Sequence, residues 1–392
     1  MTRRPRDRRQ QIIASAARQF REFGYHNVGI TGIAEAVGIT SGALYRHFGG
    51  KQELLLATVE NTLDQLQVAW SQPDATLDCL LDATCALAST GPQVGALWAR
   101  EIAHLPEERQ RELRGRLRTA TEPLRAALAV QRPELSRDAV DLLIWAMMGV
   151  ISSPAYYTAR LEPSALHQCL LDACRAVVMT PQIEPGEQAA DIADLPDVLL
   201  PASRREAILI AASRLFSARG FQAVGVDDIG AAAGITGATV YHHFPNKAAI
   251  LSAAANRVVA AMMLDLSRAL DSSQTAAEAL DKVLRFYVRI NVEHVREMRS
   301  LQNEAINLPE ADRQLLGERR ADFIAEWVAL LTADRTDLSV DEAQAVVLAA
   351  STSISALMGI PHIRRRRDIG SELVLIGEAI LGLRGAGDAP TA

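Results

Sequence analysis

Two stretches of this chain decide its fold, and they are nearly the same stretch. Residues 38–51 read GITSGALYRHFGGK, and residues 234–247 read GITGATVYHHFPNK. The displacement of 196 residues is half of the 392-residue chain, and further identities extend the match back to Arg9 and Arg205. Solenoid repeats recur every ~20–50 residues, so a period this long indicates whole domains joined in series. The sequence therefore predicts two copies of one unit.

The residues that precede each stretch have the spacing of an amphipathic helix. In the first copy, apolar residues recur every four positions from Ile12 to Phe20, and Gly24 follows as the expected C-terminal cap. A second, short helix is expected over residues 31–37 and a third over residues 41–47, with a glycine in the turn between them. Two short helices around such a turn predict a helix-turn-helix, whose second helix normally enters the major groove of DNA.

Helix geometry divides the side chains of the predicted third helix between the core and the surface. Leu44 is expected to face the core, while Gly42 and Arg46 point the opposite way, towards solvent or DNA. Gly42 would let the backbone approach closely, and Arg46 suits a guanine edge. Tyr45 and His47 can donate hydrogen bonds to phosphate. The alternatives left open are a packing role for the tyrosine, a local hydrogen bond for the histidine and a solvated surface charge for the arginine.

The charge distribution favours DNA as the partner of the two heads. The chain carries a net charge of −6, yet nine basic against three acidic residues give residues 1–51 a charge of +6. Five basic against three acidic residues give residues 203–247 a charge of +2. Positive charge therefore gathers where phosphate contacts are needed, and the first head is expected to be the stronger attractor. The four consecutive arginines at 364–367 are interpreted instead as a solvated loop.

The stretch at 38–51 resembles the helix-turn-helix signature of the TetR/AcrR family of repressors, as does the preceding helix that ends in Phe23-Gly24-Tyr25. In that family the third helix and the lysine that opens the fourth touch the operator. The resemblance implies an all-α fold in which each head precedes a helical ligand-binding body that dimerises through its last two helices. The predicted DNA-contacting residues of both heads are Thr31, Thr40, Ser41, Gly42, Tyr45, Arg46, His47, Lys51, Thr236, Gly237, Thr239, Tyr241, His242, His243 and Lys247.

The second head departs from the first at positions expected to face DNA. Gly237 stands where the first head has Ser41, and His242 stands where it has Arg46. The two heads are therefore expected to read different bases while sharing phosphate contacts, which predicts an imperfectly palindromic operator. A glycine also replaces the family's usual threonine cap before the second helix in both heads, and glycine is a tolerable cap.

Helical periodicity continues after each head, and a proline-containing acidic stretch separates the two copies. The predicted organisation is a first head over 1–51, a first regulatory body over 52–180, a linker over 181–202, a second head over 203–247 and a second body over 248–385. Segments 138–152 and 341–358, with the C-terminal helix of each unit, could form a four-helix bundle within one chain. One chain would then replace the usual homodimer as an intrachain pseudo-dimer, and two chains could still sit together on a long operator.

The effector is the part of the function on which the sequence says least. Seven side chains of the bodies are candidate pocket lining, with plain core packing as the alternative for each: Trp98, His104, Trp145, Phe286, Tyr287, Phe323 and Trp327. A mostly apolar wall favours a hydrophobic or lipid-like inducer. Residues 3–10 and 43–48 also resemble mycobacterial repressors of mammalian-cell-entry lipid-uptake operons, which implies sterol- or fatty-acid-derived ligands.

The leading hypothesis is a cytoplasmic DNA-binding transcriptional regulator, a repressor released by a small-molecule inducer, whose partner is double-stranded operator DNA. No catalytic residue, metal site or cofactor is predicted, because paired carboxylates, metal-ligand spacings, a nucleophile elbow and a phosphate loop are not found. No segment is expected to cross a membrane. Two alternatives remain: a helical lipid carrier or enzyme that does not bind DNA, and a regulator in which only the first head is active.

Overall fold

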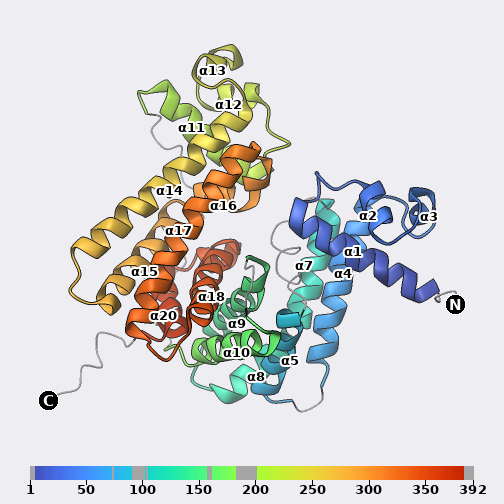
Figure 1. The fold of residues 1–392 in the computed structure, drawn as a ribbon, viewed down its shortest axis with the longest axis vertical. Helices are drawn as coiled ribbons and strands as arrows, with labels where there is room; N and C mark the ends of the chain where they lie inside the picture. Colours follow the sequence, from blue (N-terminus) through green and yellow to red (C-terminus); the bar gives the residue numbers. More distant parts are fainter. Residues whose placement is uncertain are drawn as a thin grey trace. The chain divides into compact units, whose positions relative to one another are not determined.

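The computed structural model describes residues 5–72, 75–90, 102, 105–156, 161–181 and 201–383. These residues form helices and no strand, which confirms the predicted all-α class. The chain divides into two compact units (Figure 1). The first consists of Met1–Gln182 together with Leu348–Ala356, and the second of Ile183–Val347 together with Leu357–Ala392. A middle segment of one late helix therefore groups with the first unit, which the predicted boundaries did not anticipate.

Each unit begins with three helices that form a head, followed by a long helix that leads into a helical body (Figure 1). In the first unit the elements are α1 (Pro5–Phe23), α2 (Ile30–Ala36), α3 (Ser41–Tyr45), α4 (Lys51–Trp70), α5 (Leu77–Thr90), α7 (Glu107–Ala120), α8 (Glu122–Gln131), α9 (Arg137–Ser152), the 3-10 helix η2 (Ser153–Tyr156) and α10 (Pro163–Val178). In the second they are α11 (Arg204–Arg219), α12 (Val226–Ala232), α13 (Gly237–His243), α14 (Lys247–Asp271), α15 (Ala276–Glu293), α16 (Val295–Glu304), the 3-10 helix η4 (Ala305–Asn307), α17 (Glu310–Asp334), α18 (Val340–Met358), α19 (Pro361–Arg364) and α20 (Ile369–Leu381).

The turn between the two short helices of each head depends on a glycine. Gly38 has a φ of 69° and Gly234 a φ of 70°, a left-handed conformation that residues with a Cβ adopt only at a cost. Thr40 and Thr236 follow as N-caps, because their side chains accept hydrogen bonds from the amides of Ala43 and Thr239. The two threonines predicted to contact DNA therefore also start the third helix of each head.

The third helix of the first head is shorter than expected. The sequence predicts a helix over residues 41–47, but α3 ends at Tyr45. The amides of Arg46 and His47 bond to carbonyls three residues back, at 3.3 and 2.8 Å, which is the tighter 3-10 pattern. In the second head the helical pattern continues, and α13 ends at His243.

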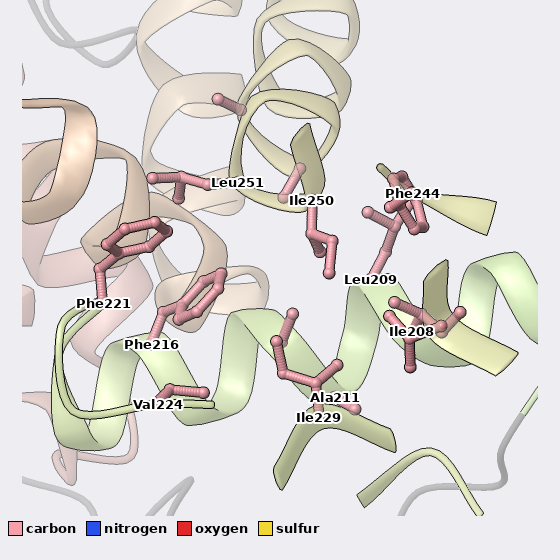
Figure 2. Close-up of a cluster of buried hydrophobic side chains, with 14 of the residues drawn as sticks. Ile208, Leu209, Ala211, Phe216, Phe221, Val224, Ile229, Phe244, Ile250 and Leu251 are labelled. Atoms are coloured by element: carbon pink, nitrogen blue, oxygen red, sulfur yellow. The ribbon is translucent and has the colours of Figure 1, made fainter. Parts of the chain in front are cut away.

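A buried apolar cluster holds the second head together (Figure 2). Ile208 and Phe216 from α11 meet Ile229 from α12, and Ile250 from α14 packs onto them. All four are at most 1% exposed. The same apolar positions are buried in the first head, where Ile12, Phe20, Ile33 and Leu54 are fully buried. Burial of side chains of this size stabilises a fold by roughly 1.5–3 kcal/mol each, so the core holds the surface of each third helix in place.

A close helix contact occurs within the first unit, between α9 and the segment Leu348–Ala356 that belongs to it. Ser353 Oγ donates a hydrogen bond to the carbonyl oxygen of Ala146 at 2.9 Å, and both residues are buried. A Cβ added to Gly149 would lie 2.6 Å from the Cα of Ser353. The absence of a side chain at Gly149 therefore allows the two backbones to come together.

Two helical stretches are long and apolar enough to cross a membrane by length and composition alone. They are Arg137–Ala155 and Lys247–Asp271, and 67% and 50% of their apolar windows are buried within the protein. Buried core helices pass the same test, so both stretches are weak evidence for a membrane span.

Candidate nucleic-acid interface

The third helix of each head presents the same kind of surface to solvent. In the first head Tyr45 is 54% exposed beside an exposed Arg46, while Leu44 is fully buried. In the second head Tyr241 is 57% exposed beside an exposed His242. A packing aromatic would be buried, so the exposure of both tyrosines matches the predicted surface role. Each head thus offers a phenol and a nitrogen donor on a helix narrow enough for the major groove.

The lysine that opens the fourth helix is engaged within each head. Lys247 Nζ donates hydrogen bonds to the carbonyl oxygens of Phe221 and Val224 at 2.6 and 2.7 Å, and it lies 4.2 Å from the centroid of the Phe221 ring. In the first head Lys51 Nζ donates to the carbonyl oxygen of His26 at 3.3 Å. Each lysine therefore ties the start of the fourth helix to the turn between the first two. Its predicted phosphate contact would have to be made from this position.

The pKa of Lys247 is lowered by burial, and the carboxylate of Glu304 opposes that shift. Burial in turn raises the pKa of Glu304, against hydrogen bonds from the Phe221 amide and the Asn307 side chain and the nearby charge of Lys247. A lysine and a carboxyl group that interact electrostatically thus lie where the head meets the body.

The second head is joined to its body by a polar junction that the sequence interpretation missed. Its members are Phe221 and Gln222 in the turn after α11, with Glu304 and Asn307 at the end of α16 and in η4. Gln222 Nε2 donates to Asn307 Oδ1 at 2.9 Å, and Asn307 Nδ2 donates to Glu304 Oε2 at 2.8 Å. We call these four residues the head–body junction. Glu304 lies in a body segment that is similar in the two copies, and that similarity was the one signal available.

The remaining predicted DNA residues lie in different surroundings in the two heads. In the first, Thr31 and Ser41 face each other, and Ser41 Oγ donates to Thr31 Oγ1 at 3.2 Å. Gly42 is exposed with no atom within 4 Å of an added Cβ, and His47 is half-buried. In the second, Gly237 is buried, while Thr239 is half-buried and His243 exposed.

Three of the seven candidate ligand residues come together in the second body. The rings of Tyr287, Phe323 and Trp327 form one cluster, with centroids 5.5 to 6.5 Å apart. Trp327 is fully buried, and among the described residues its Nε1 has no hydrogen-bond partner. Phe286 is partly exposed and lies under the guanidinium of Arg289, 5.3 Å from its ring centroid.

Trp145, in the first body, also has a buried Nε1 without a partner among the described residues. Trp98 and His104 lie outside the residues that the structure describes. A groove of about 530 Å³ in the second unit, between α15 and α20, is lined by none of the seven. Its wall is mixed, with Val288 and Val374 beside the ion pair of Arg285 and Glu378 at 2.6 Å.

Comparison with known proteins places the two heads in one family. The sequence model of the bacterial regulatory proteins of the tetR family matches the chain twice, over residues 12–58 and 208–254. Both matches contain the helix-turn-helix and the start of the fourth helix. The predicted resemblance is therefore confirmed at both heads.

Individual relatives agree over short stretches. The transcriptional regulator HbdR of Aromatoleum sp. is 40% identical over 58 residues, which are 15% of this chain and 25% of HbdR. The transcriptional activator FasR of Mycolicibacterium smegmatis is 42% identical over 63 residues, which are 16% of this chain and 29% of FasR. The chain thus spans little more than a quarter of the length of these curated relatives. A solved TetR-family regulator from Bordetella parapertussis is 19% identical, with a TM-score of 0.42 over 49% of this chain and 100% of that one.

The chain thus carries the sequence signature of the bacterial regulatory proteins of the tetR family twice in tandem, once at each head.

Proposed function

We propose that this protein is a cytoplasmic transcriptional regulator, a repressor that binds one imperfectly palindromic operator with both of its heads and is released by a hydrophobic small molecule. The observation that carries the proposal is the repeated surface of α3 and α13. Each exposes a tyrosine by more than half beside a basic or imidazole side chain, above a buried apolar core. If each head binds one major groove, both heads should expose aromatic and basic side chains at equivalent positions of their third helices.

Joining the two units in one chain would replace the usual pairing of identical subunits. Major grooves on one face of a duplex are ~34–36 Å apart, and a tether supplies the second head at high effective concentration. The proposal of an intrachain pseudo-dimer is supported by the two matches of the family model within one chain.

The proposed effector site is the aromatic cluster of the second body. Tyr287, Phe323 and Trp327 provide an apolar wall, and a buried indole N–H without a partner favours a ligand that brings a hydrogen-bond acceptor. A lipid-derived molecule with a carbonyl or carboxyl oxygen has this combination. Binding would have to favour a body conformation in which the heads are misplaced on DNA, and the head–body junction supports such a coupling.

A regulator in which only the first head binds DNA is a second candidate, favoured by one observation. Asp227 places an exposed carboxylate in the second head where the first has Thr31. A negative charge on a surface that meets phosphate weakens binding, so the two heads must be tested separately.

The test is a DNA-binding titration of the full chain with duplexes from the region upstream of its own gene, at several salt concentrations. Tyr45→Ala/Arg46→Ala should disable the first head and Tyr241→Ala/His242→Ala the second. The control Arg137→Ala removes an exposed basic residue of α9, which is not part of either head. Each lost phosphate contact should reduce the salt slope by roughly 0.9. No binding by the wild-type chain would refute the proposal, and no effect of the second pair would favour the one-headed regulator.

A further inference from the structure

The two heads differ most at the contact between their second and third helices. In the first head this contact is made by two hydroxyl groups, Thr31 Oγ1 and Ser41 Oγ, 3.2 Å apart. The positions 196 residues later are Asp227 and Gly237. The second head therefore has a carboxylate and no side chain where the first has two neutral donors.

Glycine at 237 makes room for that carboxylate. A Cβ added to Gly237 would overlap Oδ1 of Asp227 and lie 3.0 Å from its Cγ. The carboxylate thus covers the first residue of α13, and Gly237 is buried beneath it. With serine at 237, as in the first head, Asp227 could not keep this position.

A second glycine brings the helices of this head close together. A Cβ added to Gly230 would lie 2.9 Å from the amide nitrogen of Gly237 and 3.0 Å from the carbonyl oxygen of Ile235. The first head has Ala34 at the equivalent position. Two glycines and one aspartate therefore form a matched set, in which the close approach of α12 and α13 holds Asp227 against the start of α13.

The neighbouring Asp228 has a different role. Its Oδ2 accepts a hydrogen bond from the amide of Gly225 at 2.8 Å, which caps α12. Asp228 therefore stabilises the helix, whereas Asp227 lies at the α12–α13 contact and is exposed. Of the two acidic residues of α12, Asp227 is the one whose charge would face a bound duplex.

We propose that Asp227 determines the specificity of the second head by keeping the DNA backbone away from the start of α13. This inference rests on the proposed function. In the first head, Thr31 and Ser41 can donate to a phosphate, which adds affinity that does not depend on the DNA sequence. In the second head the same place repels phosphate, so binding there depends more on the base contact of His242. The first head then anchors the chain, and the second discriminates between sequences.

The test measures the DNA affinity of the second head alone. It uses the full chain, in which Tyr45→Ala/Arg46→Ala disables the first head. The probe is a duplex of 40 base pairs and mixed sequence, at low ionic strength. Asp227→Asn keeps the shape of the side chain and removes its charge. Affinity should rise about three- to ten-fold, the effect of one unit charge several ångströms from a phosphate in a medium close to water. The salt dependence should steepen by up to about one phosphate contact.

Two controls keep the outcome decisive. Asp271→Asn removes an equal charge from an exposed residue at the far end of α14, and it should leave affinity unchanged. Thr31→Asp in the otherwise wild-type chain should weaken DNA binding by a similar factor. This variant replaces Asp227→Asn as the test if Asp227→Asn melts at a lower temperature than the wild type. Equal affinity of Asp227→Asn and Asp271→Asn, in a chain whose wild type binds DNA, would overturn this inference alone. A wild type that binds no duplex would overturn the proposed function as well.

Discussion

Lys247 Nζ lies 2.6 Å from the carbonyl oxygen of Phe221 and 4.2 Å from the centroid of the ring of the same residue. The residue that the sequence marks as a phosphate contact is thus also a structural residue of the head. It joins the start of α14 to the turn after α11, and that turn is part of the head–body junction. In the first head Lys51 makes a longer bond of 3.3 Å, to His26.

Replacing the two lysines should therefore affect stability unequally. Lys247→Met removes two short hydrogen bonds from a charged donor, and it should lower the free energy of unfolding by about 2 kcal/mol. Lys51→Met removes the longer bond to His26 together with a cation–π contact to the Tyr25 ring at 4.4 Å, and it should cost about 1 kcal/mol. Urea denaturation of the two variants checks this order. Equal losses would mean that the short bonds of Lys247 add nothing to stability.

Glu304 should make the stability of the second unit depend on pH. Because burial raises its pKa above the ordinary value of 4.5, the folded state binds this proton more tightly than the unfolded state. The stabilisation is fully present below pH 4.5 and is lost as pH rises through the pKa of the folded state. Glu304→Gln has no carboxyl group at this position to ionise, so its stability does not fall for this reason as pH rises. The free energy of unfolding of the variant should therefore gain on the wild type as pH rises from 4 to 7, measured by urea denaturation. If the difference in free energy of unfolding between Glu304→Gln and the wild type stays constant from pH 4 to 7, the burial of this carboxyl group is contradicted.

Gly149 should tolerate no side chain, because a Cβ there would lie 2.6 Å from the backbone of Ser353. Gly149→Ala is expected to destabilise the protein by about 1–3 kcal/mol, the range of an overpacked core site. Gly115→Ala is the matched control, since this exposed glycine of α7 has no atom within 4 Å of an added Cβ. It should be stabilising by about 0.5–1 kcal/mol through helix propensity. Thermal melting distinguishes the two, and similar melting temperatures would show that α9 and Ser353 are not in contact in solution.

The glycines of the two third helices form a second matched pair. Gly237→Ala must displace the carboxylate of Asp227, so it should lower stability by about 1–3 kcal/mol. Gly42→Ala meets no atom within 4 Å, so its effect on stability should be small or favourable. Its exposed methyl group should instead weaken DNA binding by hindering backbone approach. The prediction fails if Gly42→Ala is the more destabilising of the two in a chemical denaturation series.

Much of the fold followed from local patterns in the sequence. The repeat, the apolar spacing from Ile12 to Phe20 and the glycine turns predicted both heads. Helix geometry correctly separated the buried Leu44 from the exposed Arg46. These features depend on residues close in sequence, because the spacing of apolar residues indicates which face of a helix is buried. The early end of α3 was missed, because it depends on whether two amides bond three or four residues back.

What could not be predicted depends on contacts between distant residues. Glu304 lies 83 residues after Phe221 in the sequence, and no local pattern around Glu304 identifies Phe221 as its partner. The burial of Gly237 under Asp227 likewise needs the distance between two helices. The second head has its glycine at 237, one position earlier than the equivalent of Gly42, and from the sequence this difference predicted a changed base contact. In the structure Gly237 lies where α12 and α13 pack against each other.

The central claim, that one chain places both heads on one duplex, is tested most directly by hydroxyl-radical footprinting of the operator, with the mass of the complex measured in parallel. A single chain should protect two patches on one face of the DNA, about one helical turn apart. Tyr45→Ala/Arg46→Ala should remove one patch and Tyr241→Ala/His242→Ala the other. A single patch that only the first pair removes, or two patches that require two chains, would contradict the claim.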